Sequence, residues 1–313
     1  MEVFRSLETS FPNPGRVAVR AILWFLVSKT PEICLALAMK AKCQTRSWLE
    51  NRWLTLTVCT LGTALVTGCS TVPVTGRTQL NLMSPSQEMQ LGFASFEETK
   101  KQLPLSQDAS AKALVQKVGQ RIAAVATTDM PHAQWEFVVF ESQEANAFCL
   151  PGGKVGVYTG LLPITKDEAG LAAVLGHEIA HAVARHGGER MSEAMVVQAG
   201  GSWLGIGPAN SDPRVQAAAQ LAYGVTAKVG AELPHSRSQE SEADHIGLVY
   251  MARAGYDPEQ AVKFWERFAI WNSKTGSETP WFLRTHPLDE VRIQQLKQWL
   301  PEARAQIPAA AAK

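Results

Sequence analysis

The chain has 313 residues, of which 46% are hydrophobic, and a formal net charge of +1. This length suits one large domain or two small ones, and the near-neutral charge gives no sign of a nucleic-acid-binding surface or of an acidic partner. Four of the five cysteines precede residue 70, so they form neither a disulfide framework nor a zinc ribbon. The cysteines are Cys34, Cys43, Cys59, Cys69 and Cys149.

The N-terminal region has the pattern of a secretory signal. Arg46 and Arg52 precede an apolar run over residues 53–66, which is too short for a comfortable membrane span, and small residues follow it. The four residues that end at Cys69 resemble a bacterial lipobox, in which the cysteine is lipidated and becomes the mature N-terminus. Ser70 resembles the next residue of signals sent to the outer membrane. The alternative is an ordinary signal or short anchor with an incidental cysteine.

Residues 1–38 fit poorly ahead of such a signal. Their apolar stretch is interrupted by charged residues and a proline, so it is a poor spanning helix. Met39 begins a basic segment of the kind that opens a signal of ordinary length. We therefore expect translation to start at Met39, residues 39–68 to be a lipoprotein signal peptide, and residues 1–38 to be absent from the natural protein.

The segment after Cys69 predicts a regular series of elements. Residues 69–83 are expected to form a tether and a first short strand. Ser84 can cap a helix that Pro85 begins, because proline suits the first helical position. The further elements expected are a helix over 85–102, a helix over 108–126, a strand over 135–140 and a hairpin over 146–160 around Pro151-Gly152-Gly153.

The next helix carries His177-Glu178-Ile179-Ala180-His181. Two histidines four residues apart project from one face of a helix, where both imidazoles can bind one zinc ion. Glu178 is then placed to take a proton from the water that zinc activates. The alternative is a helix with two unrelated histidines.

Both ends of this helix have sequence patterns that predict where it begins and ends. Thr165 and Glu168 have the spacing of a capping box, and Gly187-Gly188 is expected to end the helix. His186 is interpreted as a histidine at the helix end and not as a ligand.

The hairpin before the histidine helix has two interpretations. In zincin proteases an edge strand beside the metal helix binds the substrate backbone by strand addition, which makes Asn146, Ala147 and Phe148 candidate substrate-binding residues. The other interpretation is a purely structural hairpin. Cys149 is interpreted as a small buried hydrophobic residue, not a nucleophile.

Residues 191–233 are rich in alanine and glycine, and they are expected to form either helical core or an apolar cover over the site. An acidic motif follows this segment. A two-histidine zinc site needs a third protein ligand and one open position. Glu240 and Asp244 lie four apart on a predicted helix, so Glu240 can reach the zinc while Asp244 accepts a hydrogen bond from His177. An acidic surface helix is the alternative. The helix is expected to end near Gly255.

The C-terminal part is expected to be helical and then disordered. Asp257-Pro258 caps a helix, Pro287 opens a last one, and residues 301–313 are expected to form a disordered tail.

Four segments of the chain together resemble a known family. They are NAFCLPGGKVGVYTGLL, HEIAH, SRSQESEAD and THPLDEVRI, in this order. They resemble metallopeptidase family forty-eight, which includes HtpX-like and CAAX-prenyl-endopeptidase-like enzymes, and most closely its bacterial outer-membrane lipoprotein branch. The resemblance covers nearly all of residues 69–300. It implies an α+β, mainly helical gluzincin fold over residues 84–300, with a small β-sheet beside the HExxH helix.

The resemblance also implies roles for single residues. It makes His177, His181 and Glu240 the zinc ligands and Glu178 the general base. Asp244 would accept a hydrogen bond from a ligand histidine without binding the zinc. His286 would lie close to the metal, where it either stabilises the oxyanion or binds zinc as a fourth ligand in a latent state. Arg292 would bind the substrate or the oxyanion.

The predicted function is a zinc-dependent endopeptidase of the bacterial cell envelope that acts on misfolded or misassembled envelope proteins. Its partners would be extended peptide segments and, through a lipid on Cys69, the membrane. A non-catalytic zinc-bound chaperone or adaptor is the alternative, although it predicts loss of Glu178 or of a ligand, and all are present. A zinc hydrolase with non-peptide substrates is a third hypothesis. The sequence carries no signal for an oligomeric state.

Overall fold

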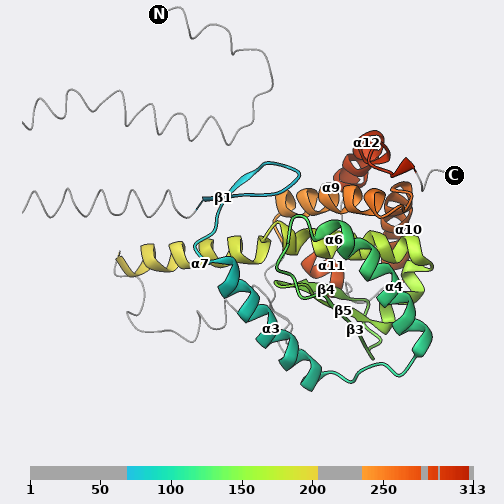
Figure 1. Ribbon diagram of the computed structural model, residues 1–313, viewed down its shortest axis with the longest axis horizontal. Helices are drawn as coiled ribbons and strands as arrows, with labels where there is room; N and C mark the ends of the chain where they lie inside the picture. Colours follow the sequence, from blue (N-terminus) through green and yellow to red (C-terminus); the bar gives the residue numbers. More distant parts are fainter. Residues whose placement is uncertain (1–68, 204–234, 276–280, 288–289, 310–313) are drawn as a thin grey trace, which may run out of the picture. The chain divides into compact units, whose positions relative to one another are not determined.

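The computed structural model describes residues 69–203, 235–275, 281–287 and 290–309 (Figure 1). The predicted signal peptide, the N-terminal extension and the segment over 204–234 lie outside this described part. Within it, no helix has both the length and the apolar character needed to cross a membrane.

The described chain is mainly helical and includes two small β-sheets (Figure 1). This agrees with the predicted α+β fold. The strands are β1 (Cys69–Thr71), β2 (Thr78–Leu80), β3 (Glu136–Phe140), β4 (Ala147–Leu150) and β5 (Lys154–Tyr158). The helices are α3 (Pro85–Gln102), α4 (Ala109–Ala126), η1 (Thr159–Leu161), α5 (Leu162–Thr165), α6 (Glu168–Val183), α7 (His186–Trp203), α9 (Arg237–Arg253), α10 (Glu259–Thr275), α11 (Trp281–Thr285) and α12 (Glu290–Arg304).

Several predicted elements are confirmed with their local signals. Ser84 caps α3 in a capping box with Gln87, and Asp108 caps α4. In the three-stranded sheet β5 is central, antiparallel to β4 and parallel to β3, which confirms the hairpin around Pro151. Strand β4 is therefore an edge of this sheet, as substrate binding by strand addition requires.

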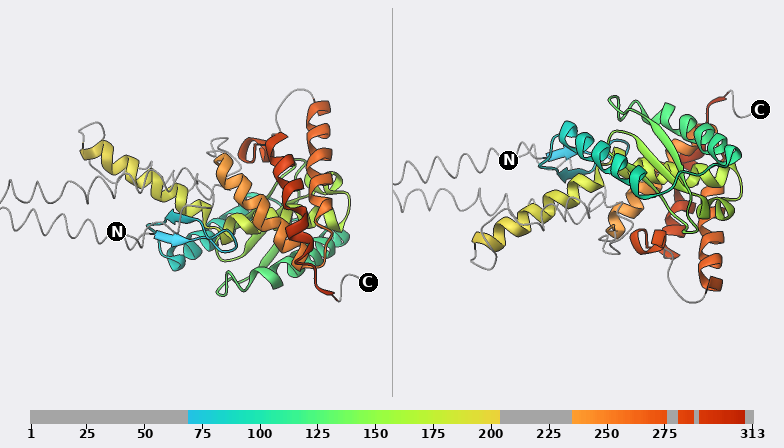
Figure 2. Two further views of the ribbon diagram at one scale, coloured as in Figure 1. Left: turned by 90° about the horizontal axis from the view of Figure 1, so that it is seen from above. Right: turned by 90° about the horizontal axis from the view of Figure 1, so that it is seen from below.

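Helix α6 lies at the centre of the core. Every residue from Gly170 to Val183 is buried, so the helix has no solvent-facing side. It packs against α4, α9, α10 and the edge strand β4, and α12 lies alongside α9 (Figures 1 and 2). A helix that is apolar all round is stable only when it is enclosed in this way. The enclosure brings the two histidines of α6 into the interior.

Two glycines allow α6 and α9 to approach closely. A Cβ atom on Gly176 would lie 2.9 Å from the carbonyl oxygen of Gly247, and one on Gly247 would lie 2.9 Å from the backbone nitrogen of His177. Only glycine fits at such a backbone contact. The contact lies beside His177 on α6 and three residues after Asp244 on α9, so it sets the distance between the two halves of the site.

The predicted ends of α6 are wrong at both termini. The N-cap is Asp167, whose side chain accepts from the amide of Gly170, because Thr165 belongs to α5 and Lys166 ends that helix with a φ of 72°. At the other end Arg185 adopts a φ of 56°, and its guanidinium binds the buried Glu88. The chain turns there, and Gly187-Gly188 lies in the first turn of α7.

Residues 69–83 include the expected short strand, but the part before it docks on the domain where a tether was expected. Strands β1 and β2 form an antiparallel hairpin, and Val72 is buried in the main core. Gln79 donates to the carbonyl of Ala184 at the end of α6, at 2.7 Å. Local sequence does not predict this docking, because its polar partners are about a hundred residues away.

The C-terminal segment is helical further than expected. Helix α12 continues through Pro301 to Arg304. Ala303 is buried, and Glu302 and Arg304 pair with His245 and Glu259. These tertiary contacts outweigh the backbone hydrogen bond that Pro301 cannot make.

The close helix contact generates a prediction. Gly247→Ala is expected to lower the free energy of unfolding by about 1–3 kcal/mol, the usual cost of overpacking, and to weaken zinc binding because α6 and α9 must separate. Urea unfolding and competition with a zinc chelator measure the two effects. Ser238→Ala, at an exposed position of α9, is the control. Unchanged stability and zinc affinity in Gly247→Ala would contradict this account of the contact.

Candidate metal centre

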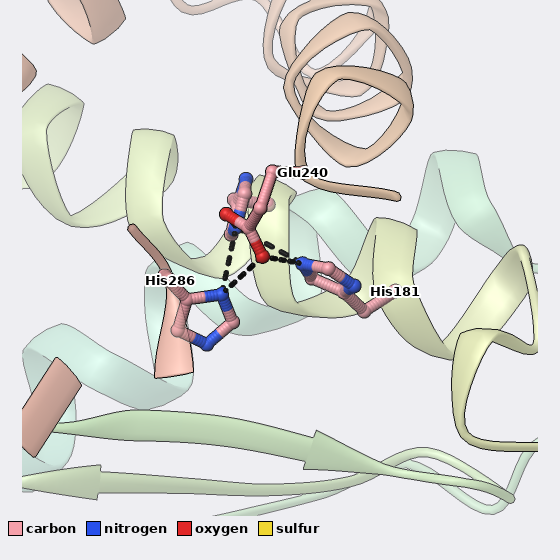
Figure 3. Close-up of side chains that lie close together, drawn as sticks. His181, Glu240 and His286 are labelled. Carbon is pink, nitrogen blue, oxygen red and sulfur yellow. Dashed lines mark hydrogen bonds and ion pairs between the residues drawn. The ribbon is translucent and has the colours of Figure 1, made fainter. Parts of the chain in front are cut away.

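Four buried side chains from three segments converge on one point. His177 and His181 come from α6, Glu240 from the first turn of α9, and His286 from the residue after α11. Figure 3 shows His181, Glu240 and His286 pointing toward one another. One nitrogen or carboxylate oxygen from each of the four lies within 4.8 Å of the others.

The distances between these atoms suit a single small ion. His181 Nε2 lies 3.1 Å from His177 Nε2 and 3.3 Å from Glu240 Oε1, and His286 Nδ1 lies 2.9 Å from the same oxygen. Ligands about 2.1 Å from a tetrahedral zinc ion lie about 3.4 Å apart.

The donor chemistry supports the same conclusion. Imidazole nitrogens and a carboxylate oxygen are donors that zinc prefers. The Nε2 atoms of His177 and His181 face each other, an arrangement that needs a proton or a cation between their lone pairs. The residues present therefore fit zinc.

Asp244 lies where the spacing predicts. Its Oδ1 atom is 3.0 Å from His177 Nδ1, so the other ring nitrogen, Nε2, faces the cluster. This arrangement fixes the tautomer of a ligand histidine and raises its basicity.

Arg292 occupies a different place from the one expected. It is buried and lies behind the cluster, where Nε and Nη2 donate to the two oxygens of Asp244 at 2.8 and 2.9 Å. Its Nη1 atom is 2.8 Å from Glu240 Oε2, and the guanidinium lies over the Trp265 ring. Nη1 also donates to the carbonyl of Pro287 at 2.9 Å. These contacts give Arg292 a role in holding the two carboxylates, and its part in binding the substrate or the oxyanion stays a prediction.

The electrostatics keep the carboxylates charged. Burial raises the pKa of Glu240, but His286, Arg292 and His177 outweigh it and hold the pKa well below its usual range. For Asp244, burial likewise raises the pKa, and Arg292 and His177 lower it further than burial raises it. In contrast, burial lowers the pKa of His181 well below its usual value, so this imidazole is neutral and able to bind a metal.

Glu178 is in a different electrostatic environment. Burial raises its pKa above the ordinary value, and Oε1 has no hydrogen-bond partner among the described residues. His286 of the cluster lies beside it, with 3.6 Å between Oε1 of Glu178 and Nε2 of His286. A buried carboxylate with a raised pKa and a free oxygen is suited to accept and return a proton near neutral pH.

The edge strand β4 runs beside α6 (Figure 1). Asn146 is buried, and Oδ1 of its side chain has no hydrogen-bond partner in the described part of the chain. Ala147 is buried in the main core. Phe148 packs against Phe96 and Phe140 in a second apolar cluster, so only its backbone is suited to contact a substrate.

Cys149, on the same strand, is not arranged as a nucleophile. Burial raises the pKa of its thiol well above the usual value, and the nearby charge of Glu178 raises it further. The thiol therefore stays protonated, as expected of a small hydrophobic residue.

Sequence reasoning missed a part of the site behind His181. His186 is fully buried at the start of α7, with its Nδ1 2.7 Å from Nδ1 of His181 and its Nε2 3.0 Å from Oε2 of Glu242. The ring of His235 lies beside that of His181, tilted by 38° with 4.0 Å between the centroids, and His235 contacts Arg190. The available signal was Glu242, which lies two residues from Glu240 in the same acidic motif.

Comparison with known proteins identifies the family. Residues 109–300 match the family model described as Peptidase family M48. The mitochondrial metalloendopeptidase OMA1 of Schizosaccharomyces pombe is 36% identical over 237 residues, which cover 74% of this chain and 66% of the relative.

Two further relatives come from a fish and a bacterium. Metalloendopeptidase OMA1, mitochondrial, of Danio rerio is 34% identical, with 74% of this chain and 50% of the relative covered. The beta-barrel assembly-enhancing protease of Escherichia coli K12 is 28% identical, with 76% of this chain and 49% of the relative covered. The chain thus spans about half to two thirds of the length of these relatives. The family match and the donor cluster together show that the chain belongs to peptidase family M48, a family of zinc-dependent metallopeptidases.

Proposed function

We propose that the protein is a zinc-dependent endopeptidase in which His177, His181 and Glu240 hold the metal and Glu178 is the general base. The observation that carries this proposal is the buried cluster of four donor groups with Glu178 beside it. When bound, zinc polarises the scissile carbonyl and acidifies water.

Each protein group then has a defined task. Glu178 accepts the proton from the attacking water and returns it to the leaving amine, which suits its raised pKa. Asp244 and Arg292 keep His177 and Glu240 oriented. The edge strand β4, with Asn146 just before it, would offer backbone groups at Asn146, Ala147 and Phe148 to an extended peptide, which favours peptides over other substrates of zinc hydrolases.

We place His286 as a fourth ligand in a latent state. A catalytic zinc site keeps one position open for water, whereas a site with four protein ligands is closed. The Nδ1 atom of His286 lies 3.3 Å from His177 Nε2 and so occupies the fourth corner of the cluster. Activation then requires His286 to move away, after which it can stabilise the oxyanion.

The proposed location is the bacterial cell envelope, with a lipid anchor on Cys69 in an outer membrane facing the periplasm. Two observations support it: the lipobox-like segment that ends at Cys69, and similarity to an E. coli protease named for β-barrel assembly. The proposed role is quality control of misfolded or misassembled envelope proteins. The mitochondrial OMA1 relatives favour a second candidate location, in mitochondria.

Glu178→Gln is expected to keep zinc but to lower proteolysis at least about a hundredfold, because the amide cannot accept the proton. Cleavage of unfolded casein and metal analysis of the purified protein measure the two effects. Glu98→Gln, on the exposed face of α3, is the matched control and should retain full activity. Substantial cleavage by Glu178→Gln would remove this glutamate from the mechanism. In cells, Glu178→Gln should retain uncleaved envelope substrates.

His286→Ala tests latency. If His286 closes the site, the variant should cleave unfolded casein faster than the parent protein and bind zinc more weakly, because one ligand is lost. Complete loss of cleavage with zinc still bound would instead assign His286 to the oxyanion.

Cys69→Ser tests the anchor. In a Gram-negative host, the parent chain should incorporate labelled palmitate and sediment with outer membranes, whereas the variant should do neither. Labelling and sedimentation that persist in Cys69→Ser would refute the anchor while leaving the peptidase proposal intact.

A further inference from the structure

The two histidines of α6 are contacted at their Nδ1 atoms by two different networks of side chains. His177 contacts Asp244, which Arg292 of α12 binds. His181 contacts His186, and His186 contacts Glu242. The first network lies within the residues that match the family model, but the second extends to the β1–β2 hairpin, which precedes them.

The second network has one consistent arrangement of protons. If His181 binds zinc through Nε2, its Nδ1 carries the proton and donates to Nδ1 of His186. His186 then carries its own proton on Nε2 and donates to Oε2 of Glu242, 3.0 Å away. All three side chains are buried, so water competes little for these bonds. The orientation of the His181 ring therefore depends on where Glu242 is held.

The hairpin holds Glu242. Arg77 donates from Nε to Oε2 of Glu242 at 2.7 Å, and Thr75 donates its hydroxyl to Oε1 at 2.5 Å. The two Nη atoms of Arg77 donate to Glu189 at 2.5 and 2.9 Å, and Gln239 also donates to Glu189. Arg77 is thus the cation shared by two buried carboxylates on α7 and α9.

We propose that Arg77 of the β1–β2 hairpin is a positioning residue of the zinc site, acting on His181 through Glu242 and His186. Without Arg77, Glu242 is a buried carboxylate that has lost its main counter-charge, so it shifts toward water and releases His186. The zinc affinity of the domain therefore depends on the docked hairpin, although the hairpin contributes no ligand. The inference rests on the proposed ligand role of His181.

The test is the zinc dissociation constant, measured by chelator competition on the full chain. Arg77→Gln and Glu242→Gln are each expected to raise it about tenfold or more, the usual effect of losing the partner of a metal-bound histidine. Arg304→Gln removes an exposed arginine–glutamate pair and is the matched control, with no change expected. The rise in melting temperature on adding zinc should also shrink in the two variants and persist in the control.

A double-mutant cycle separates positioning from a general loss of stability. Because Arg77 acts through His186, adding Arg77→Gln to His186→Gln should weaken zinc binding little further. If Arg77→Gln does not fold, Thr75→Val removes one hydroxyl donor to Glu242 and should give a smaller effect in the same direction. Equal melting-temperature losses with and without zinc, at an unchanged dissociation constant, would overturn the proposal.

His181→Ala distinguishes this proposal from the proposed function. If His181→Ala binds zinc as tightly as the parent, the ligand assignment itself fails. If His181→Ala loses zinc but Arg77→Gln and Thr75→Val keep normal affinity, the ligand assignment stands and only the role of the hairpin is wrong.

Discussion

The close approach of α6 and α9 is the constraint on which the site depends. The two metal-binding histidines of the proposed site are on α6, while the carboxylate ligand and the carboxylate behind His177 are on α9. A side chain on Gly176 or Gly247 would force the two backbones apart. Because zinc ligands must lie within a few ångströms of one another, a separation of even one ångström would leave the site incomplete.

The second constraint is the charge that this contact buries. The first half of α9 brings Glu240, Glu242 and Asp244 into the interior, and burying an unpaired carboxylate is costly. The fold supplies one buried arginine, Arg292, for the Glu240–Asp244 pair, and Arg77 for Glu242. The contact of His177 with Asp244 and the hydrogen bond of His186 to Glu242 complete this balance, so the same groups that orient the ligands also make the buried charges tolerable.

Family M48 includes relatives whose names place them in mitochondria and in connection with bacterial β-barrel assembly. The match to the family model begins at the first residue of α4. The β1–β2 hairpin lies before it, yet it contacts the end of α6 and the residues behind His181. In our proposals the lipidated Cys69 is the first residue of this hairpin, so membrane attachment and metal affinity involve neighbouring residues.

Local sequence was sufficient for most elements and for the residues at the centre of the site. Periodicity and capping residues predicted α3, α4, the β4–β5 hairpin and α9, because these signals act within one or two turns of the chain. The same reasoning placed the ends of α6 wrongly. Arg185 leaves the helix because of a distant partner, Glu88, where a glycine pair was expected to end it.

The sequence by itself determined the two metal-binding motifs, because a spacing of four residues on a helix aligns side chains whatever the surroundings. Only the tertiary structure decided what lies behind them. Arg292 pairs with Asp244 and Glu240, helix α12 continues to Arg304 with Ala303 buried, and residues 69–80 form a docked hairpin. The positions of Arg292 and of the hairpin depend on pairing buried carboxylates with arginines 48 to 165 positions away, and no local pattern encodes such partners.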